Sequence, residues 1–290
     1  MTLNDLYLGA IITIYARQLK VADYGDVFTR KYFENKRSRT YAMIKPDAYQ
    51  HIGKILDIVI KNGFFVNRLR MFKWTVEQAQ GFYAEHKGKP FFEDLTKFMS
   101  GDVAVGMELI ADSAVEKWRA LIGPTYSLTA RTSAPNSIRA LFGIDGGKNV
   151  VHGSDSNISA AREIEYVFGP DNATATTALL NNCSCLVIKP HAILAGHAGK
   201  IIDTVLEEGF EISALEQFNL NKPTAEEFFE VYKGVLPEFT PMVEHMITGP
   251  VISMEIRQEN AVQALRELVG PHDPEIARHL RSNSIRYGLQ

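Results

Sequence analysis

The feature of this chain that most restricts its fold is an internal repeat. Gly53-Lys54-Ile55 recurs as Gly199-Lys200-Ile201, and the four residues from Asn136 to Arg139 recur from Asn283 to Arg286. The separation between equivalent residues changes by only a few positions along the chain, which is typical of two copies of one domain and excludes a solenoid of short units. We therefore predict two tandem domains, joined by a linker over residues 171–182 that follows Gly169-Pro170.

Each copy has the pattern of a mixed domain of helices and strands. In the first copy, hydrophobic periodicity predicts strands at 39–44, 64–74, 103–110 and 150–151, and helices at 52–60, from Thr75 onward, at 114–122 and at 158–168. A Pro/Gly-rich loop is expected between Thr125 and Arg139. This order matches the βαββαβ unit of ferredoxin-like domains. The predicted fold class is therefore α+β, with tandem ferredoxin-like domains over residues 40–170 and 183–290.

The second copy is predicted to be incomplete. By the repeat, the counterpart of His152 is expected at about position 299, beyond Gln290. The last strand and last helix of this copy are then missing, which leaves a sheet edge and an apolar face for another segment or partner to cover. Residues 1–39 belong to neither copy. They hold one or two strand patterns, too few for an independent core, so we expect this segment to dock on something.

One histidine of the first copy lies where an anion is expected to bind. His152 ends a short apolar run, and Ser154, Asp155 and Ser156 after it are typical N-cap residues of a helix. The N-terminus of a helix presents unpaired N–H groups and partial positive charge, which favour a phosphate there. Imidazole titrates near neutrality and can act as a covalent nucleophile. An isolated histidine at a strand end usually has no chemical role, so a functional role for His152 depends on the residues that accompany it.

Composition excludes several classes of protein. The chain is 46% hydrophobic and 22% charged, as in a globular protein with a core, and its net charge of -3 gives no basic field for nucleic acid. Neither a membrane-spanning run nor a basic leader at Met1–Asp5 is present in the sequence. Cys183 and Cys185 are expected on opposite faces of a strand, without a disulfide, which indicates a reducing compartment. We expect a cytosolic protein or a member of a cytosolic assembly.

The first copy resembles the nucleoside diphosphate kinase family over its full length. The resemblance is carried by Ile44-Lys45-Pro46-Asp47, Pro90-Phe91-Phe92, Ser137-Ile138-Arg139 and the His152 motif. The paired copies and the segment from Asp5 to Asp26 are similar to the two-domain ciliary members of that family. In those proteins the N-terminal segment is the tail of a DM10 module, so residues 1–39 are identified as a partial DM10-like segment.

The resemblance implies a two-step transfer, in which a histidine takes the γ-phosphate of a nucleoside triphosphate and passes it to a diphosphate. It implies that His152 is the nucleophile, that Glu163 and Ser154 orient its ring, and that the catalytic set also includes Tyr83 and Lys45. The residues implied to bind the nucleotide are Lys45, Arg119, Thr125, Arg139 and Asn149 for phosphates and ribose, with Phe91 and Leu95 for the base. Mg²⁺ is implied as a cofactor that arrives with the nucleotide and has few direct protein ligands.

The second copy is expected to be non-catalytic. It keeps Lys189, Arg266 and Arg286 at matching positions, but Phe229 replaces Tyr83 and His272 replaces Thr125. The residues outside the motif, which we expect to have no catalytic role, are His191, His197, His245 and His279.

Two further functions remain to be weighed against catalysis. The resemblance to ciliary members implies a structural place in the axoneme of a cilium or flagellum, with tubulin, doublet microtubule proteins or a γ-tubulin complex as partners. Such a role is compatible with an active site, and the incomplete second copy favours it. A P-loop ATPase is excluded by the sequence, because Gly196 to Lys200 is only a partial match to the required motif.

Overall fold

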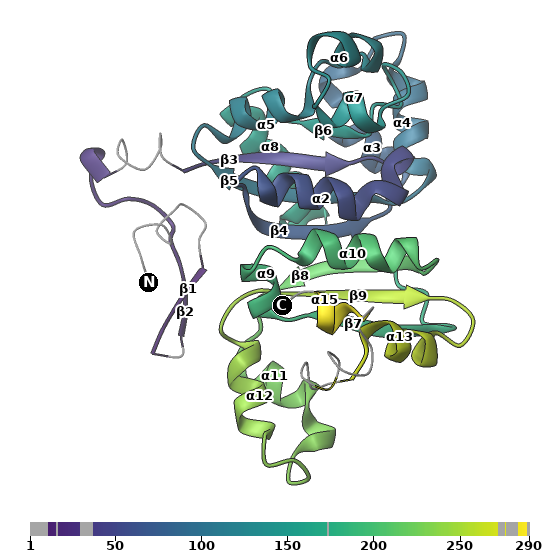
Figure 1. Ribbon diagram of the computed structural model, residues 1–290. Coiled ribbons are helices and arrows are strands. Elements are labelled where there is room, and N and C mark those ends of the chain that lie inside the picture. Colours follow the sequence, from purple (N-terminus) through teal and green to yellow (C-terminus); the bar gives the residue numbers. More distant parts are fainter. Residues whose placement is uncertain are drawn as a thin grey trace.

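One antiparallel sheet runs through the molecule. The computed structural model describes residues 11–15, 17–29, 37–172, 174–271, 276 and 284–288. Within them, seven strands pair in the order β6-β3-β5-β4-β8-β9-β7, and helices pack on the sheet (Figure 1). We call the described residues from 38 to 172 the first unit and those from 174 to 288 the second unit.

The two units share one sequence of elements. Those of the first unit are β3 (Ser38–Ile44), the 3-10 helix η2 (Pro46–His51), α2 (Ile52–Lys61), β4 (Phe65–Phe72), α3 (Val76–Phe82), η3 (Ala84–His86), α4 (Phe92–Gly101), β5 (Ala104–Ala111), α5 (Ala114–Ile122), α6 (Ser127–Ser133), α7 (Ile138–Phe142), β6 (Val151–Gly153), α8 (Asn157–Phe168) and η4 (Pro170–Asn172). Those of the second unit are β7 (Cys183–Ile188), α9 (Pro190–Leu194), α10 (Ala198–Glu207), β8 (Glu211–Phe218), α11 (Lys222–Phe228), η5 (Glu230–Tyr232), α12 (Phe239–Met246), β9 (Val251–Arg257), α13 (Ala261–Val269) and α15 (Ile285–Gly288).

The predicted fold class is confirmed. In the first unit, β3 pairs antiparallel with both β5 and β6, and β5 pairs antiparallel with β4. Numbered along the chain, β3, β4, β5 and β6 are strands 1, 2, 3 and 4 of the unit. Their order in the sheet, β6-β3-β5-β4, is therefore the 4-1-3-2 order of a ferredoxin-like domain. In the second unit, β9 lies between β7 and β8 in the same way. Each unit adds further helices between its second and third strands.

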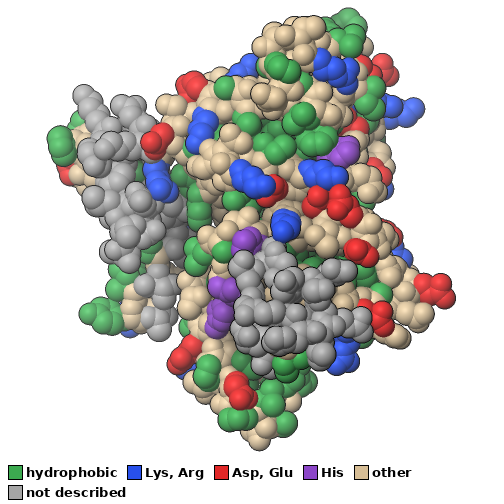
Figure 2. Space-filling model, viewed as in Figure 1, with side chains coloured by type: hydrophobic (Ala, Val, Ile, Leu, Met, Phe, Trp, Pro, Cys, Tyr) green, Lys and Arg blue, Asp and Glu red, His purple; other side chains and the backbone are tan. Residues whose placement is uncertain are grey.

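The units join through equivalent elements. Arg70 of β4 pairs with Glu216 of β8, and their side chains form an ion pair at 2.7 Å, so the sheet continues from one unit into the other. Alongside, α2 packs against α10 (Figure 1). Basic and acidic side chains gather over this contact (Figure 2). Across it, the ammonium of Lys54 lies 3.1 Å from the carboxylate of Glu207. The repeated sequence therefore forms an approximately two-fold symmetric interface.

The close approach of α2 and α10 depends on two repeated glycines. A Cβ atom on Gly53 would lie 2.2 Å from the backbone nitrogen of Asp203, and one on Gly199 would lie 2.3 Å from that of Asp57. Any side chain at either position would force the helices apart. The repeat of Gly-Lys-Ile in the sequence thus marks the crossing point of the two helices.

Two apolar clusters support the functional region. The larger one runs under α2, α5 and α10 and includes residues from both units. The smaller one lies on the other face of the first unit's sheet, where Tyr41, Met43, Phe72 and Phe82 pack with residues of α3, α4 and α8. Within β6, the edge strand of the described sheet, His152 contacts Tyr41 and Phe82 of this smaller cluster, whereas Val151 is buried in the larger one.

Several local predictions need correction. The segment between Thr125 and Arg139 is not only a loop, because it contains α6, which buried Ser127 anchors by donating to the carbonyl of Asp145 at 2.9 Å. The helix predicted at 158–168 is present as α8, which begins one residue earlier at Asn157. Ile158 is 85% exposed, and Ala160, Glu163, Ile164 and Val167 are the buried residues. The N-cap of α8 is Ser156, whose side chain accepts from the N–H of Ser159.

The cysteines also need correction. Both thiols are free, as expected, but residues two apart on a strand share a face, and Cys183 and Cys185 line one pocket.

Part of the N-terminal segment is described. β1 (Ile11–Ile14) and β2 (Arg17–Lys20) pair as an antiparallel hairpin beside the first unit (Figure 1). Val21 packs against Ile110 of β5. Residues 1–10 and 30–36 lie outside the described part, so the DM10-like assignment stays a prediction. Among the described residues, none of the helices combines the length and the hydrophobicity needed to cross a membrane.

Candidate functional site

A strained turn presents His152. Val150 has a φ of 61°, a left-handed conformation that β-branched residues rarely adopt, and the N–H of Val151 donates to the carbonyl of Asn149 at 2.7 Å. Two groups from the β3–η2 junction hold this turn. The N–H of Lys45 donates to the carbonyl of Val150 at 2.8 Å, and the carboxylate of Asp47 accepts from the N–H of Val150 at 3.1 Å.

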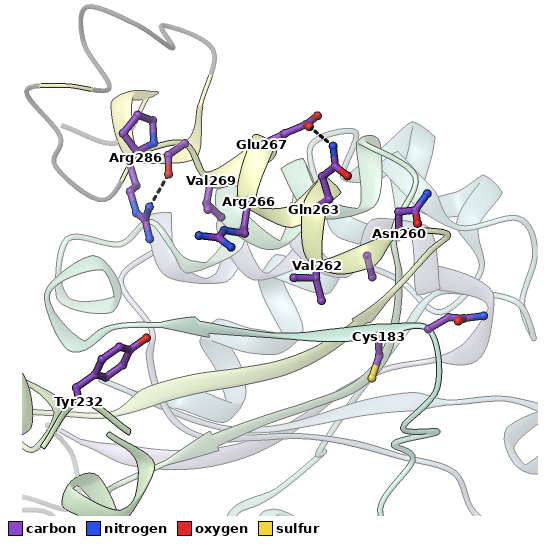
Figure 3. A pocket seen from close by; sticks show the side chains of 13 residues that line it. Cys183, Tyr232, Asn260, Val262, Gln263, Arg266, Glu267, Val269 and Arg286 are labelled. Carbon is purple, nitrogen blue, oxygen red and sulfur yellow. Dashed lines mark hydrogen bonds between the residues drawn. The ribbon is translucent and has the colours of Figure 1, made fainter. Parts of the chain in front are cut away.

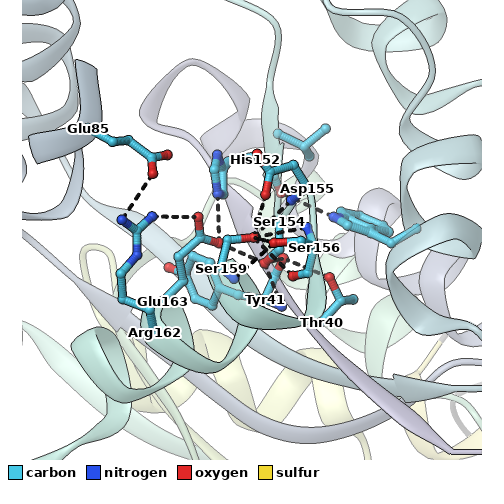
Figure 4. A network of polar contacts seen from close by, with 12 residues as sticks. Thr40, Tyr41, Glu85, His152, Ser154, Asp155, Ser156, Ser159, Arg162 and Glu163 are labelled. Atoms are coloured by element: carbon cyan, nitrogen blue, oxygen red, sulfur yellow. Dashed lines mark hydrogen bonds and ion pairs between the residues drawn. The ribbon is translucent and has the colours of Figure 1, made fainter.

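The ring of His152 is held through one nitrogen only. Its Nε2 lies 3.0 Å from Oε2 of Glu163, and the hydroxyl of Ser154 donates to the same oxygen at 2.7 Å (Figure 4). A carboxylate accepts, so we assign the ring proton to Nε2, which leaves the lone pair on Nδ1 available. Glu163 is 4% exposed and His152 is 21% exposed at the side chain, so the ring remains accessible while its anchor is buried.

Aromatic side chains form the wall behind the imidazole. The rings of Phe82 and Tyr83 meet it edge to face, with centroids 5.4 and 6.1 Å away, and Tyr41 lies 6.0 Å away. The hydroxyl of Tyr83 is buried and has no hydrogen-bond partner among the residues that the structure describes. Burial raises the pKa of the Tyr83 phenol well above its ordinary value, so this group stays a neutral donor. An unpaired donor beside a nucleophile suits an incoming phosphate oxygen.

Lys45 and Asn149 lie together below the turn. The ammonium of Lys45 donates to Oδ1 of Asn149 at 2.7 Å, and the amide of Asn149 donates to the carbonyl of Thr125 at 3.0 Å. Lys45 is 7% exposed, and burial lowers its pKa to about 8, with Asp47 opposing that shift and Arg139 adding to it. An anion that displaced one of these contacts would therefore gain a nearly buried cation as its partner.

The two arginines predicted to bind phosphate share a pocket of about 300 Å³ with Thr125. Arg139 donates to the carbonyl of Val151, the neighbour of His152, at 3.0 Å. Its Nε is buried and meets no acceptor within the described part of the chain. Burial, followed by the charge of Arg119, lowers the pKa of Arg139 to about 10. An orphaned guanidinium N–H and a second arginine beside it are the donor set that an anionic ligand would satisfy.

The predicted base-binding residues lie on the other side of Tyr83. Phe91 is 49% exposed at the start of α4, and its ring meets His86 edge to face at 5.6 Å. His86 in turn stacks on Tyr83 at 6.1 Å. Leu95, one turn into α4, is partly buried against the smaller apolar cluster. The structure thus brings all predicted site residues of the first unit to one end of the sheet, with Phe91 and Leu95 at its outer edge.

The equivalent region of the second unit is open. Among its described residues, no strand lies beside β7 in the place that β6 takes beside β3. A cavity of about 1150 Å³ lies there, along β7 and α13, and both Arg266 and Arg286 line it (Figure 3). Phe229 is buried. Lys189 is exposed, and its pKa is lowered by desolvation and then by the charge of Arg286. His272 lies outside the described residues. The described residues of this unit place no histidine at the position equivalent to His152.

Sequence reasoning missed several residues of the site. Asp47 supports the turn, Trp118 donates to the carbonyl of His152 at 3.2 Å, and Arg162 faces the carboxylate of Glu163. Asp47 follows directly on the Lys45-Pro46 motif, which is the one signal that points to it. Arg162 precedes Glu163 on a helix, where charged residues are common, so the sequence holds no signal for it.

The site offers no ready-made cage for a metal. The described residues contain no cluster of three or more potential metal ligands, and the charged groups in the 300 Å³ pocket are arginines. This donor set fits a magnesium ion that the phosphates of a nucleotide hold, with water completing its shell.

Comparisons with known proteins identify a family for this chain. The family model described as nucleoside diphosphate kinase matches residues 38–173 and 182–289. The nucleoside diphosphate kinase homolog 7 of Rattus norvegicus is 42% identical over 288 residues, which cover 99% of this chain and 73% of that protein. The nucleoside diphosphate kinase of Aquifex aeolicus is 48% identical over 132 residues, which cover 45% of this chain and 93% of that enzyme.

A crystal structure of the Aquifex aeolicus enzyme aligns with 47% of this chain and 98% of its own, at 46% identity and a TM-score of 0.46. The family model covers most of the chain in two segments that follow its internal repeat. The chain therefore belongs to the nucleoside diphosphate kinase family.

Proposed function

We propose that the first unit transfers the γ-phosphate of a nucleoside triphosphate to a nucleoside diphosphate through a phosphohistidine at His152. The observation that carries this proposal is the one-sided anchoring of the ring, whose Nε2 meets Glu163 while Nδ1 has no hydrogen-bond partner among the described residues. Tautomer, exposure and the backing aromatic wall all favour Nδ1 as the attacking atom.

In the first step, the Nδ1 lone pair attacks the γ-phosphorus and the bond to the β-phosphate oxygen breaks, which releases the diphosphate. Positive charge develops on the ring, and the buried Glu163 carboxylate stabilises it through the Nε2 proton. Ser154 fixes the carboxylate that receives this bond. In the second step, the same bonds form and break in reverse with a different diphosphate, so one site serves both nucleotides.

The cationic residues hold the phosphates in line. Transfer of a phosphoryl group depends mainly on positioning and on neutralisation of charge. Lys45, Arg119 and Arg139 supply the positive charge, and Tyr83 and Asn149 supply neutral donors beside it. Phe91 offers a ring face to the base, which is compatible with any base because stacking reads no edge. Bound Mg²⁺ would add charge neutralisation at the phosphates.

Initial-rate kinetics test this proposal. With ATP and GDP varied together, double-reciprocal plots should give parallel lines, because the triphosphate leaves as diphosphate before the second nucleotide binds. Intersecting lines would indicate direct transfer between two bound nucleotides and would overturn the relay. If the purified chain shows no measurable phosphate transfer from ATP to GDP, the proposal is overturned altogether.

A structural role in the cytoplasm, within the axoneme of a cilium or flagellum, is the second candidate. It is favoured by strongly exposed apolar side chains, which include Tyr15 and Phe28 in the N-terminal segment and Leu180, Val231 and Val235 in the second unit. Large exposed apolar surfaces are typical of interaction sites. In this role tubulin, a doublet microtubule protein or a γ-tubulin complex covers these surfaces.

Sedimentation with stabilised microtubules tests the structural role. We expect the chain to pellet with them whether or not His152 is intact. Chain that stays in the supernatant with microtubules in excess would contradict direct binding to tubulin.

A further inference from the structure

A chain of charged side chains connects the nucleophile to the segment that leads to Phe91. Glu163 meets His152 and Ser154 through Oε2, and its other oxygen, Oε1, lies 3.7 Å from Nη2 of Arg162 (Figure 4). The Nη1 of the same guanidinium lies 3.0 Å from Glu85 on η3. Arg162 is thus the charged group that faces the free side of the carboxylate that orients the reactive ring.

We propose that Arg162 is a positioning residue for phosphate transfer, which acts through Glu163 to oppose protonation of the His152 ring before attack, and that Glu85 offsets part of this effect. The proposal rests on the function proposed above. It concerns the protonation of the nucleophile, which must carry a lone pair at Nδ1 in order to attack phosphorus.

The exposure of these side chains indicates that the charge of Arg162 affects the protonation of the site more than the stability of the fold. Arg162 and Glu85 are each 47% exposed, and an exposed ion pair of this kind contributes little to folding. Glu163, in contrast, is 4% exposed, so the field of a cation beside it is less screened. A positive charge at this place opposes a second positive charge on the imidazole. Glu85 offsets part of it, because its carboxylate lies against the same guanidinium.

Other groups around the ring do not supply this charge. Tyr41 on β3 and Tyr83 at the end of α3 are buried, and burial raises the pKa of each phenol, so both stay neutral. The pKa of His86 on η3 is lowered by burial and then by Lys89, which favours the neutral form of the His86 ring.

At the start of α8, Asp155 has its pKa lowered mainly by hydrogen bonds from Ser159 and Ser156, with a weaker effect of Arg119. This carboxylate therefore stays charged in every variant considered below.

The test is the pH dependence of phosphorylation of the enzyme by ATP in a single turnover. In Arg162→Gln, the midpoint of the acidic limb should move to higher pH by about half a unit, because the imidazolium is no longer opposed. In Glu85→Gln, the midpoint should move to lower pH, because Arg162 is no longer offset. Arg162→Lys keeps the charge and should restore the wild-type midpoint.

Two controls make the result specific. Lys97→Gln removes an exposed positive charge from α4 and should leave the midpoint unchanged. The Arg162→Gln shift should also persist in a His86→Gln background, which removes the titration of that second imidazole. Thermal melts establish that each variant is folded before its pH profile is compared.

The outcomes separate this inference from the function on which it rests. The inference is overturned if the acidic limb of the pH profile does not move in Arg162→Gln, even if the plateau rate falls. It is also overturned if the limb moves in the same direction in Arg162→Gln and in Glu85→Gln. Those results leave a working relay intact. A wild-type chain that takes no phosphate from ATP overturns the proposed function itself.

Discussion

Replacement of His152 by alanine is expected to lower phosphate transfer between nucleotides by at least about 10³-fold, since removal of a covalent nucleophile abolishes both half-reactions. Nothing else in the described part of the site can take over. Tyr83 is neutral and buried, Ser154 donates its proton to Glu163, and His86 faces Lys89 through Nδ1 at 3.0 Å. The measurement is kcat/KM for transfer from ATP to GDP by the purified chain.

The matched control is a histidine of the second unit. His245 pairs with His191 at 3.0 Å, away from the first unit's site, so His245→Ala should keep transfer within about two-fold of wild type, as surface substitutions usually do. A loss of phosphate transfer in both His152→Ala and His245→Ala would indicate that the activity depends on the integrity of the fold and is not specific to His152. Transfer that survives in His152→Ala would remove His152 from the mechanism.

Replacement of Gly199 by alanine is expected to destabilise the chain by about 3 kcal/mol, at the upper end of the cost of overpacking. Within a helix, alanine is normally better than glycine by about 1 kcal/mol, so a loss would reverse the intrinsic preference. The cause is the backbone of Asp57, which a Cβ atom on Gly199 would approach to 2.3 Å. Thermal unfolding should show a fall in Tm of roughly 5–10 °C for a loss of this size.

Gly53→Ala should have a similar effect, because its Cβ would meet Asp203 at the equivalent place. Gly101→Ala is the matched control, since it adds the same atom at the end of α4 where nothing lies within 4 Å. An unchanged Tm in both Gly53→Ala and Gly199→Ala would contradict the close packing of α2 on α10.

Much of the fold was predictable because the repeat and the apolar periods are local signals. The strand from 39 to 44 follows from its short continuous apolar run, and the helix from 52 to 60 follows from the 3.6-residue period. The family resemblance then supplied the candidate site as a set, including Glu163, which lies eleven residues from its partner and carries no signal of its own.

Other features depend on contacts that no single segment encodes. The continuous sheet depends on Arg70 meeting Glu216, 146 residues away. The buried face of α8 departs from simple hydrophobicity, because Glu163 is buried with bonds to His152 and Ser154 while Ile158 is exposed to solvent. The left-handed φ of Val150 contradicts its residue type, and only the carboxylate of Asp47 and the backbone of Lys45 explain how the turn is held.

The most direct test of the account is to isolate the phosphorylated chain. After incubation with γ-labelled ATP, the label should sit on Nδ1 of His152, should be lost in acid and kept in base, and should leave as labelled GTP when GDP is added. Label on another residue, or label on His152 that GDP does not remove, would contradict the claim that this imidazole carries the phosphate between nucleotides.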